Sequence, residues 1–325
     1  MSNRPRRRPS QLLKPFVDTN RANQKGIFKL SDTVLILNKK HCMRDDIDSA
    51  VRQMRAEGHD IAVRIPWEFD DITRLFDHAL STGARRVIAA GGDGTVNTMI
   101  NLIVDRKAQD EIELSLLPLG TANDFARGTD IPVGDPVGAL RLACSGSAQA
   151  IDVGLVNGRH FVNVASGGIG AEITSTTPSD LKRMLGGAAY SLMGLVKASE
   201  LTPYEARVVT SDGEEEGKIL LVSIGNSRFA GGGFDVAPKA SLIDGLLDLA
   251  VVTTPKDGDL DTLVDELADP FNEANKVLHY RQLNECVIET KQPLPMNLDG
   301  EPTLDTRFEF KIKPKCIKMV LGQVF

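Results

Sequence analysis

The first 120 residues alternate short apolar runs with longer amphipathic segments, and this alternation limits the folds open to the chain. Four apolar runs have the length of buried strands: 31–40, 60–67, 85–90 and 112–120. Three segments between them repeat apolar residues at helical spacing: 45–58, 70–83 and 95–105. Strands that alternate with helices of this length predict a doubly wound α/β domain with a mostly parallel sheet.

After about residue 150 the pattern changes to short strands joined by tight turns. Asn157-Gly158 and Asp212-Gly213 each stand between two strand-like runs, which is the pattern of a β-hairpin. Further strand-like runs follow at 245–254, 284–301 and 306–314, and helical runs near 179–200 and 258–277 interrupt them. We therefore expect three parts: a basic arm at 1–26, an α/β domain at 27–150 and a mainly antiparallel β domain at 151–325, whose final segment is a candidate to return to the first domain.

Composition narrows the class of protein. The chain has 325 residues, enough for two domains, and is 42% hydrophobic and 25% charged, as soluble globular proteins are. No apolar run approaches the length that crosses a bilayer. Four scattered cysteines lack a CxxC pair, which favours a reduced, cytoplasmic protein over a disulfide framework or a zinc site. We expect no nucleic-acid partner, and the sequence leaves the oligomeric state open.

The arm is the most basic part of the chain. Residues 1–26 hold seven Lys or Arg and one Asp, a net charge of +6, whereas residues 27–325 carry −12. The arm lacks the apolar core of a signal peptide, so we do not expect secretion. One interpretation is a solvated, disordered tail; another is a polybasic arm that binds anionic lipid, at about 1 kcal/mol per basic residue. The two interpretations are compatible.

A glycine loop with one acid follows the third predicted strand. Gly91-Gly92-Asp93-Gly94-Thr95 stands between a strand and a helix, where residues without Cβ and free N–H groups can cradle phosphate. The loop fits neither the P-loop nor the GxGxxG pattern, and a simple tight turn is the alternative. Bound phosphate would repel Asp93 unless that acid binds Mg²⁺, water or a hydroxyl. The acid therefore indicates phosphoryl-transfer chemistry.

A second loop follows the fourth predicted strand. Thr121 offers a hydroxyl to phosphate, and Asp124 is a candidate cap for a helix that begins at Phe125. The carboxyl ends of parallel strands meet at one edge of the sheet, so we expect the two loops to face one another there.

Several of these motifs together resemble a known protein family. GGDGTVN at 91–97 and LGTANDFAR at 119–127 resemble the diacylglycerol-kinase catalytic fold, in its YegS-type lipid kinase branch. The resemblance covers nearly all of residues 31–325 and includes five further motifs in the family's order: LILNKKH, VRIPWE, IDVG, APKASLIDGLLDL and LDGEP. It implies an α/β domain like that of NAD kinase, a C-terminal β-sandwich and ATP in the cleft between them. It also implies transfer of the γ-phosphoryl group of ATP to a hydroxyl of a membrane lipid, such as diacylglycerol or phosphatidylglycerol, with peripheral contact to the membrane.

The resemblance also implies residue roles. The expected nucleotide contacts are Asn38, Lys40, Pro66, Gly91, Gly92, Asp93, Gly94, Thr95, Asn97, Gly120, Thr121 and Asn123. Asp93, Asp152 and Glu301 would act near the transferred phosphate, with Glu301 accepting the proton of the lipid hydroxyl. A structural Mg²⁺, in addition to the ion on ATP, would bind the Asp244 side chain and the main-chain carbonyls of Ser241 and Leu246.

Other interpretations stay open. Without the resemblance, Asp152 is a strand-end acid, Glu301 is an acid beside a hairpin turn and Asp244 lies in a turn. GGDGT also occurs in kinases of NAD and other soluble alcohols. The loop at Asn38–Cys42 departs from the NPxSG pattern of the broader family, which keeps a non-catalytic nucleotide-binding regulator among the hypotheses.

Overall fold

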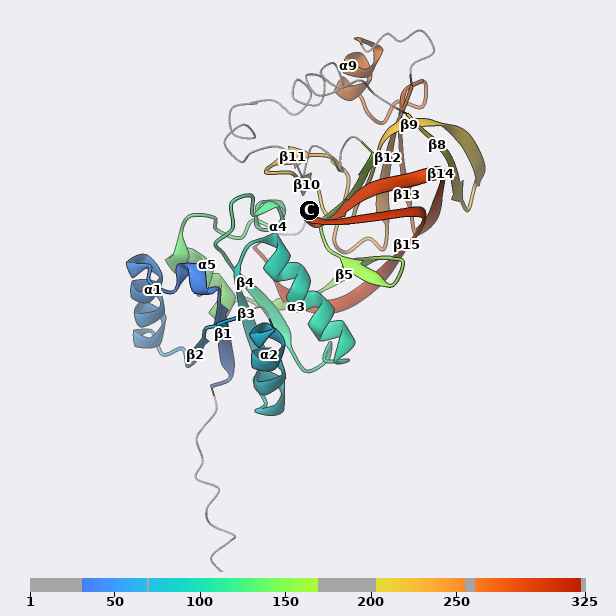
Figure 1. Cartoon of the computed structure of the whole chain (residues 1–325). Coiled ribbons are helices and arrows are strands. Elements are labelled where there is room, and N and C mark those ends of the chain that lie inside the picture. The colour runs from blue at the N-terminus through green and yellow to red at the C-terminus, as the bar shows by residue number, and fades with distance from the viewer. Residues whose placement is uncertain (1–30, 69, 169–202, 255–260, 323–325) are drawn as a thin grey trace, which may run out of the picture. The chain divides into compact units, whose positions relative to one another are not determined.

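A parallel sheet forms the core of the first half of the chain, as the alternating pattern predicts (Figure 1). The computed structural model describes residues 31–68, 70–168, 203–254 and 261–322. The parallel strands are β1 (Thr33–Leu37), β2 (Ile61–Arg64), β3 (Arg86–Gly91) and β4 (Glu113–Pro118). They pair in the order β2-β1-β3-β4.

Helices cover both faces of this sheet. They are α1 (Asp45–Ala56), α2 (Asp71–Ser81), α3 (Asp93–Asp105), α4 (Asp124–Gly128) and α5 (Pro136–Ser145), with a short 3-10 helix, η1 (Lys39–His41). Val34 and Ile36 of β1 are buried in one core cluster with residues of α2 and α3. Leu35 and Leu37 are buried in another cluster with residues of α1 and α5. Because successive side chains of a strand point to opposite faces, the continuous apolar run of β1 fits a sheet covered on both sides.

Glycines end the first two long helices where the sequence predicts it. Gly58 and Gly83 follow α1 and α2 with φ values of 98° and 78°, a left-handed backbone that favours glycine. The next N–H groups, of His59 and Ala84, donate back to carbonyls of the last helical turn at 3.0 Å each. Both helices therefore stop before the strand that follows.

The second half is built from antiparallel strands, which confirms the predicted α/β plus β fold class. Its strands in the main sheet are β5 (Ala148–Val156), β6 (Arg159–Phe161), β7 (Val164–Gly168), β8 (Tyr204–Thr210), β9 (Gly213–Gly225), β12 (Leu247–Thr253), β13 (Leu278–Leu283), β14 (Glu285–Leu298) and β15 (Glu301–Val320). A small hairpin joins β10 (Phe229–Ala230) to β11 (Phe234–Asp235), and α9 (Asp261–Ala268) lies within the helical run expected near 258–277. Phe161, Phe308 and Phe310 are buried in a separate core cluster of this half.

Tight turns occur at or next to the predicted dipeptides. Asn157-Gly158 joins β5 to β6 with φ values of 47° and 84°, the left-handed pair typical of a two-residue hairpin. The other turn lies one residue before the predicted Asp212-Gly213: Ser211-Asp212 joins β8 to β9, and Gly213 is the first residue of β9. The predicted hairpins are therefore present, and the same left-handed pair recurs at Asp299-Gly300 between β14 and β15.

Strand β15 connects the two halves. Its first part pairs with β14 in antiparallel orientation, and Lys318 and Met319 near its end pair in parallel with Glu113 and Leu114 of β4. The parallel and antiparallel strands therefore belong to one hydrogen-bonded sheet.

Two of the sequence predictions concern residues that the structure does not describe: the basic arm at 1–26 and the helical run near 179–200. Among the described ranges, no helix has the length and apolar character needed to cross a membrane.

Candidate active site

The order in which strands join the parallel sheet reverses between β1 and β3. After β1 the chain continues to β2 on one side, and β3 then pairs on the other side of β1. Open α/β sheets bind their ligands at such a switch point, beyond the carboxyl ends of the strands. Here the β1 and β3 ends lead into the loop that begins at Asn38 and the loop that begins at Gly91.

The two predicted phosphate loops contact each other through glycine. A Cβ atom added to Gly120 would lie 2.6 Å from Cα of Gly92, and one added to Gly92 would lie 3.0 Å from Cα of Gly120. A Cβ on Gly91 would lie 2.2 Å from Oγ1 of Thr95. Only glycine fits these positions without a shift of the neighbouring atoms. The structure thus brings the loops after β3 and β4 together, main chain against main chain.

Asp93 is the first residue of α3. The preceding Gly92 has no side chain, and no side chain caps this helix. The exposed start of α3 therefore retains N–H groups that favour an anion. Oδ1 of Asp93 accepts hydrogen bonds from the Phe125 main-chain N–H at 2.9 Å and from Nδ2 of Asn163 at 3.3 Å. The acid thereby connects the first loop, the start of α4 and the β domain.

In the second loop, the side chains of Asn123 and Thr121 differ in their contacts. Asn123 has a left-handed backbone (φ 52°) and closes its own loop: its amide accepts from the Gly120 N–H and donates to the Gly120 carbonyl, each at 2.8 Å. The Thr121 side chain is exposed, so its hydroxyl is accessible from solvent.

The expectation that Asp124 caps a helix at Phe125 is wrong. Helix α4 already begins at Asp124, and Asn123 occupies the position before it. The Asp124 carboxylate is buried and accepts a hydrogen bond from the Gly232 N–H at 2.9 Å, in the turn between β10 and β11. Burial raises the pKa of Asp124 above its ordinary value. Asp124 therefore attaches a β-domain hairpin to the second loop.

The loop after β1 holds the remaining predicted nucleotide contacts. Oδ1 of Asn38 accepts from the Lys40 N–H at 3.0 Å and so caps η1, whereas the Lys40 side chain is exposed. Pro66 is buried beyond the end of β2. Beside it, Nζ of Lys39 donates to the Trp67 carbonyl at 3.1 Å and lies 4.6 Å from the centre of the Trp67 ring. The contact of Lys40 and Pro66 with a nucleotide stays a prediction.

Asn97 lies one turn after Asp93 on α3 and contacts the β domain. Its Nδ2 donates to Oδ2 of Asp299 at 2.9 Å and to the His160 carbonyl at 3.0 Å. The amide NH₂ group of Asn97 therefore links the two halves of the chain. A contact between Asn97 and ATP stays a prediction.

Asp299 is a site residue that the sequence did not predict, because an acid in an Asp-Gly hairpin is usually solvated. Its carboxylate is buried and also accepts from three consecutive main-chain N–H groups, of Val162 at 2.7 Å, Asn163 at 2.9 Å and Val164 at 3.1 Å. Burial raises the pKa of Asp299 to about 6, although these hydrogen bonds oppose the shift. The one sequence feature that could have identified Asp299 is its position in the LDGEP motif.

The raised pKa of Asp299 predicts a pH-dependent stability. The folded protein holds this proton more tightly than the unfolded chain, so the contribution to stability is present below about pH 4 and is lost as pH rises through 6. We expect the unfolding free energy of wild type to fall between pH 4 and 7 by on the order of 2–3 kcal/mol more than that of Asp299→Asn. Urea titrations of both proteins at several pH values measure this difference, and parallel pH profiles would contradict it.

Glu301 begins β15, two residues after Asp299, and reaches α3 from the β domain. Its side chain is about half exposed, and Oε2 accepts a hydrogen bond from Arg159 at 2.5 Å. Both residues line a polar cavity of about 230 Å³ together with Asn97 and Thr98 of α3. The structure therefore brings Glu301 and α3 to the same cavity.

Asp152 contacts the predicted metal loop rather than the glycine loops. Its side chain is buried; Oδ1 accepts from the Lys315 N–H and Oδ2 from the Gly245 N–H, each at 2.7 Å. Both oxygens thus bind main chain, one in β15 and one beside Asp244. These contacts fix the position of the loop that carries Asp244.

The predicted metal loop presents oxygen atoms that suit a hard cation. Oδ1 of Asp244 accepts from the Leu246 N–H at 2.9 Å, while no described residue donates to Oδ2. Within the described ranges, the carbonyl oxygens of Ser241 and Leu246 also receive no hydrogen bond. Burial raises the pKa of Asp244, and the charge of Asp152 adds to that rise. No group of three or more His, Cys, Asp or Glu side chains in the described part could hold a metal, so any site here depends on these carbonyls.

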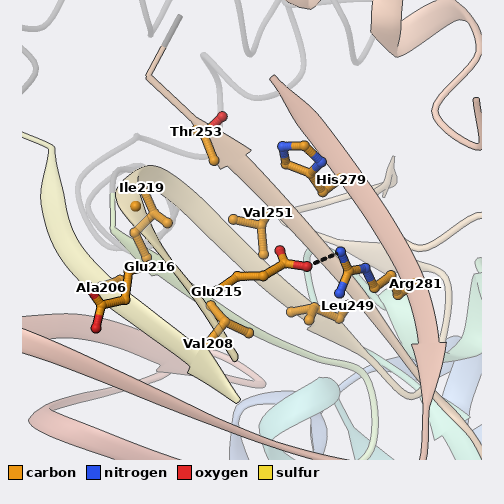
Figure 2. Close-up of a pocket in the computed structure, with 11 residues that line it drawn as sticks. Ala206, Val208, Glu215, Glu216, Ile219, Leu249, Val251, Thr253, His279 and Arg281 are labelled. Carbon is orange, nitrogen blue, oxygen red and sulfur yellow. Dashed lines mark hydrogen bonds and ion pairs between the residues drawn. The ribbon is translucent and has the colours of Figure 1, made fainter. Parts of the chain in front are cut away.

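A second cavity lies in the β domain (Figure 2). It measures about 160 Å³ and lies between β8, β9, β12 and β13, with Leu249 and Val251 on its apolar side. Glu215 forms an ion pair with Arg281 beside them. None of the predicted site residues lines this cavity.

The fold and the paired glycine loops define a kinase of the diacylglycerol-kinase class. Residues 32–156 match the diacylglycerol kinase catalytic domain, and residues 163–321 match the YegS C-terminal NAD kinase beta sandwich-like domain. The chain belongs to the YegS-like lipid kinase family and is therefore an enzyme, a phosphotransferase.

Individual relatives agree with this assignment. A protein named "Probable lipid kinase YegS-like" from Chromohalobacter salexigens is 42% identical over 289 residues, which cover 88% of this chain and 92% of that protein. One of the same name from Shewanella frigidimarina is 38% identical over 288 residues, 88% of this chain and 93% of that protein. The crystal structure of a diacylglycerol kinase from Bacillus anthracis str. Sterne has a similar fold, with a TM-score of 0.70 and 24% identity over 89% of this chain and 96% of that one.

Proposed function

We propose that this protein transfers the γ-phosphoryl group of ATP to a free hydroxyl of a membrane lipid and that it depends on Mg²⁺. The observation that carries the proposal is the contact of Gly92 with Gly120 beside Asp93. That contact brings the two glycine loops together at the carboxyl edge of the sheet. The uncapped start of α3 and the acid Asp93 lie at the same place. Such a site can hold phosphate and also manage the metal that accompanies it.

In the proposed reaction, each part of the site has a distinct task. The main-chain N–H groups at the start of α3 bind the ATP phosphates, and Thr121 adds a hydroxyl from the second loop. Asp93 would hold a Mg²⁺ ion, which would neutralise charge on the phosphates when bound. Glu301 accepts the proton of the lipid hydroxyl as the oxygen attacks phosphorus, and the bond to the ADP oxygen breaks. Asp152 supports the reaction through its contacts with the Asp244 loop and β15.

Asp244, with the carbonyls of Ser241 and Leu246, is the proposed structural Mg²⁺ site. We expect Asp244→Ala to lower the melting temperature and to reduce the stabilisation that Mg²⁺ provides, because the variant removes the only charged ligand of this set. MgATP affinity should change little, since the loop is separate from the glycine loops in sequence and contacts. Thermal denaturation with and without Mg²⁺ measures the effect. A variant with the melting temperature and the Mg²⁺ response of wild type would contradict the proposed structural Mg²⁺ site.

We propose peripheral contact with the membrane, assisted by the basic arm. Deletion of residues 1–26 should weaken sedimentation with anionic vesicles, because the remaining chain carries a net charge of −12. Binding of the full chain should also fall as salt rises, since exposed charges are screened over about 8 Å at physiological ionic strength. Neutral vesicles serve as the control. Binding that survives the deletion and does not respond to salt would contradict the role of the arm.

The acceptor is tested with labelled ATP, Mg²⁺ and a panel of lipids in mixed micelles. The panel contains diacylglycerol, phosphatidylglycerol, a sphingoid base, ceramide and an isoprenoid alcohol, and NAD is added as a soluble alternative. Label in at least one lipid and none in NAD is the expected result. Transfer to NAD alone would replace the lipid proposal with a soluble-acceptor kinase.

A further inference from the structure

Asn163, which lies between β6 and β7, contacts both acidic segments of the site. Its side chain is buried, and Nδ2 donates to Oδ1 of Asp93 at 3.3 Å. Its main-chain N–H donates to Oδ1 of Asp299 at 2.9 Å. Its carbonyl accepts from the Asn226 N–H at 2.8 Å. One residue of the β domain therefore binds the acid of the glycine loop and the acid that precedes Glu301.

The chemistry of the partners fixes the orientation of the amide. An ionised carboxylate only accepts hydrogen bonds, so the NH₂ group of Asn163 faces Asp93. The amide oxygen is buried and receives no hydrogen bond within the described part of the chain. Among the described residues, the Asn163 side chain therefore makes one hydrogen bond, and its acceptor is the acid of the glycine loop.

Asn163 also limits how Asp93 can move. Oδ1 of Asp93 receives the Phe125 N–H from the α/β domain and the Asn163 amide from the β domain. Without the hydrogen bond from Asn163, the Asp93 carboxylate would still bind the N–H of Phe125 in α4, but this link to the β domain would be lost. Asp299, held by Asn163, Val162 and Val164, fixes the turn from which Glu301 begins.

We propose that Asn163 is a positioning residue. It fixes the position of the Asp93 side chain relative to that of Glu301, and so holds the phosphate-binding loop and the acceptor base in one fixed arrangement. The inference rests on the proposed lipid kinase reaction. Asn163 thus acts through Asp93 and Asp299 and does not itself transfer a proton.

Two variants of Asn163 test the inference. Asn163→Ala removes the donor to Asp93 and should lower kcat by about 10- to 100-fold, the usual range for a residue that orients a functional group. The lipid KM and the MgATP Kd should stay within about threefold, because no contact to either substrate is removed. Asn163→Asp keeps the volume but places a second carboxylate beside Asp93. Its carboxylate cannot donate a hydrogen bond to an ionised Asp93, so this variant should also lose kcat while substrate affinity stays near wild type.

Asn157→Ala is the matched control. Asn157 also makes two hydrogen bonds to main chain, to the Arg307 carbonyl at 2.7 Å and from the Glu309 N–H at 2.9 Å, at a hairpin turn of the β domain. It should lower stability and leave kcat unchanged.

The outcomes separate the two proposals. An active wild type together with wild-type kcat in both Asn163 variants overturns the positioning role alone. A loss of kcat no larger than that of Asn157→Ala also overturns it. If wild type phosphorylates no lipid, the proposed function fails and the positioning role fails with it. If Asn163→Ala does not fold, Asn163→Asp, which is nearly isosteric, decides the question.

Discussion

Replacement of Asp93 by asparagine is expected to lower phosphoryl transfer by about 10²- to 10³-fold, the scale of losing one fixed electrostatic contact to the reacting phosphate. The amide keeps an oxygen that can accept the Phe125 N–H, so the fold should survive. The negative charge is lost, and with it the means to hold a cation beside the phosphates. MgATP affinity should therefore fall together with turnover, which isothermal titration and the lipid assay measure in parallel.

The control for Asp93 is a carboxylate elsewhere in the same domain. Asp77 of α2 is partly exposed and pairs with Arg106 at 2.8 Å. Asp77→Asn should leave MgATP binding and turnover at wild-type values, because an exposed pair contributes little. Equal activity of wild type and Asp93→Asn would exclude the acid of the glycine loop from the mechanism.

Glu301→Gln is expected to reduce turnover by about 10²- to 10⁴-fold while MgATP affinity stays near wild type. A general base acts only as the proton moves, so its loss affects kcat and not nucleotide binding. In the structure Glu301 lies on the cavity beside α3, and its partner Arg159 can still hydrogen-bond to the amide oxygen of glutamine. The expected defect is therefore chemical rather than structural. The pattern differs from that of Asp93→Asn, in which both quantities fall.

Glu309→Gln provides the comparison on the same strand. Glu309 is a partly exposed residue of β15 that pairs with Lys311 at 3.0 Å, as Glu301 pairs with Arg159. Loss of this ion pair should not change turnover. Full activity of Glu301→Gln on the true lipid acceptor would show that the base is another group.

The fold could be predicted because its signals are local. The apolar run of β1 and the helical spacing after it are properties of neighbouring residues, and both domains follow from such patterns. Asn157-Gly158 specifies its turn through the backbone freedom of two residues. The path of β15 between the antiparallel and parallel strands of the sheet is different, because it depends on which strand edge is free after the other strands have paired.

The site was predicted in part, and the missed residues share one property. The glycine loops are evident because they need glycine for local reasons. Asp299, by contrast, owes its role to partners that are distant in sequence, among them Asn97, which is 202 positions away. Asn163 and Asp124 likewise gain their roles from partners in the other half of the chain. A sequence pattern around each of these residues resembles an ordinary turn or helix end.

The roles of Asp152 and Glu301 came from the family resemblance, and the structure gives them different surroundings. Asp152 has both oxygens bound to main chain, whereas Glu301 is accessible on a cavity. A buried carboxylate with both oxygens bound suits the support of a loop. An accessible one suits proton transfer to a substrate that enters from solvent.

The most direct measurement of the central claim compares ATP labelled in the γ position with ATP labelled in the α position. Purified protein, Mg²⁺ and mixed micelles of an accepted lipid are incubated with each, and the lipid extract is counted. We expect label in the extract from γ-labelled ATP only, and none when the lipid hydroxyl is methylated. Label from α-labelled ATP, or transfer to the methylated lipid, would contradict γ-phosphoryl transfer to a lipid hydroxyl.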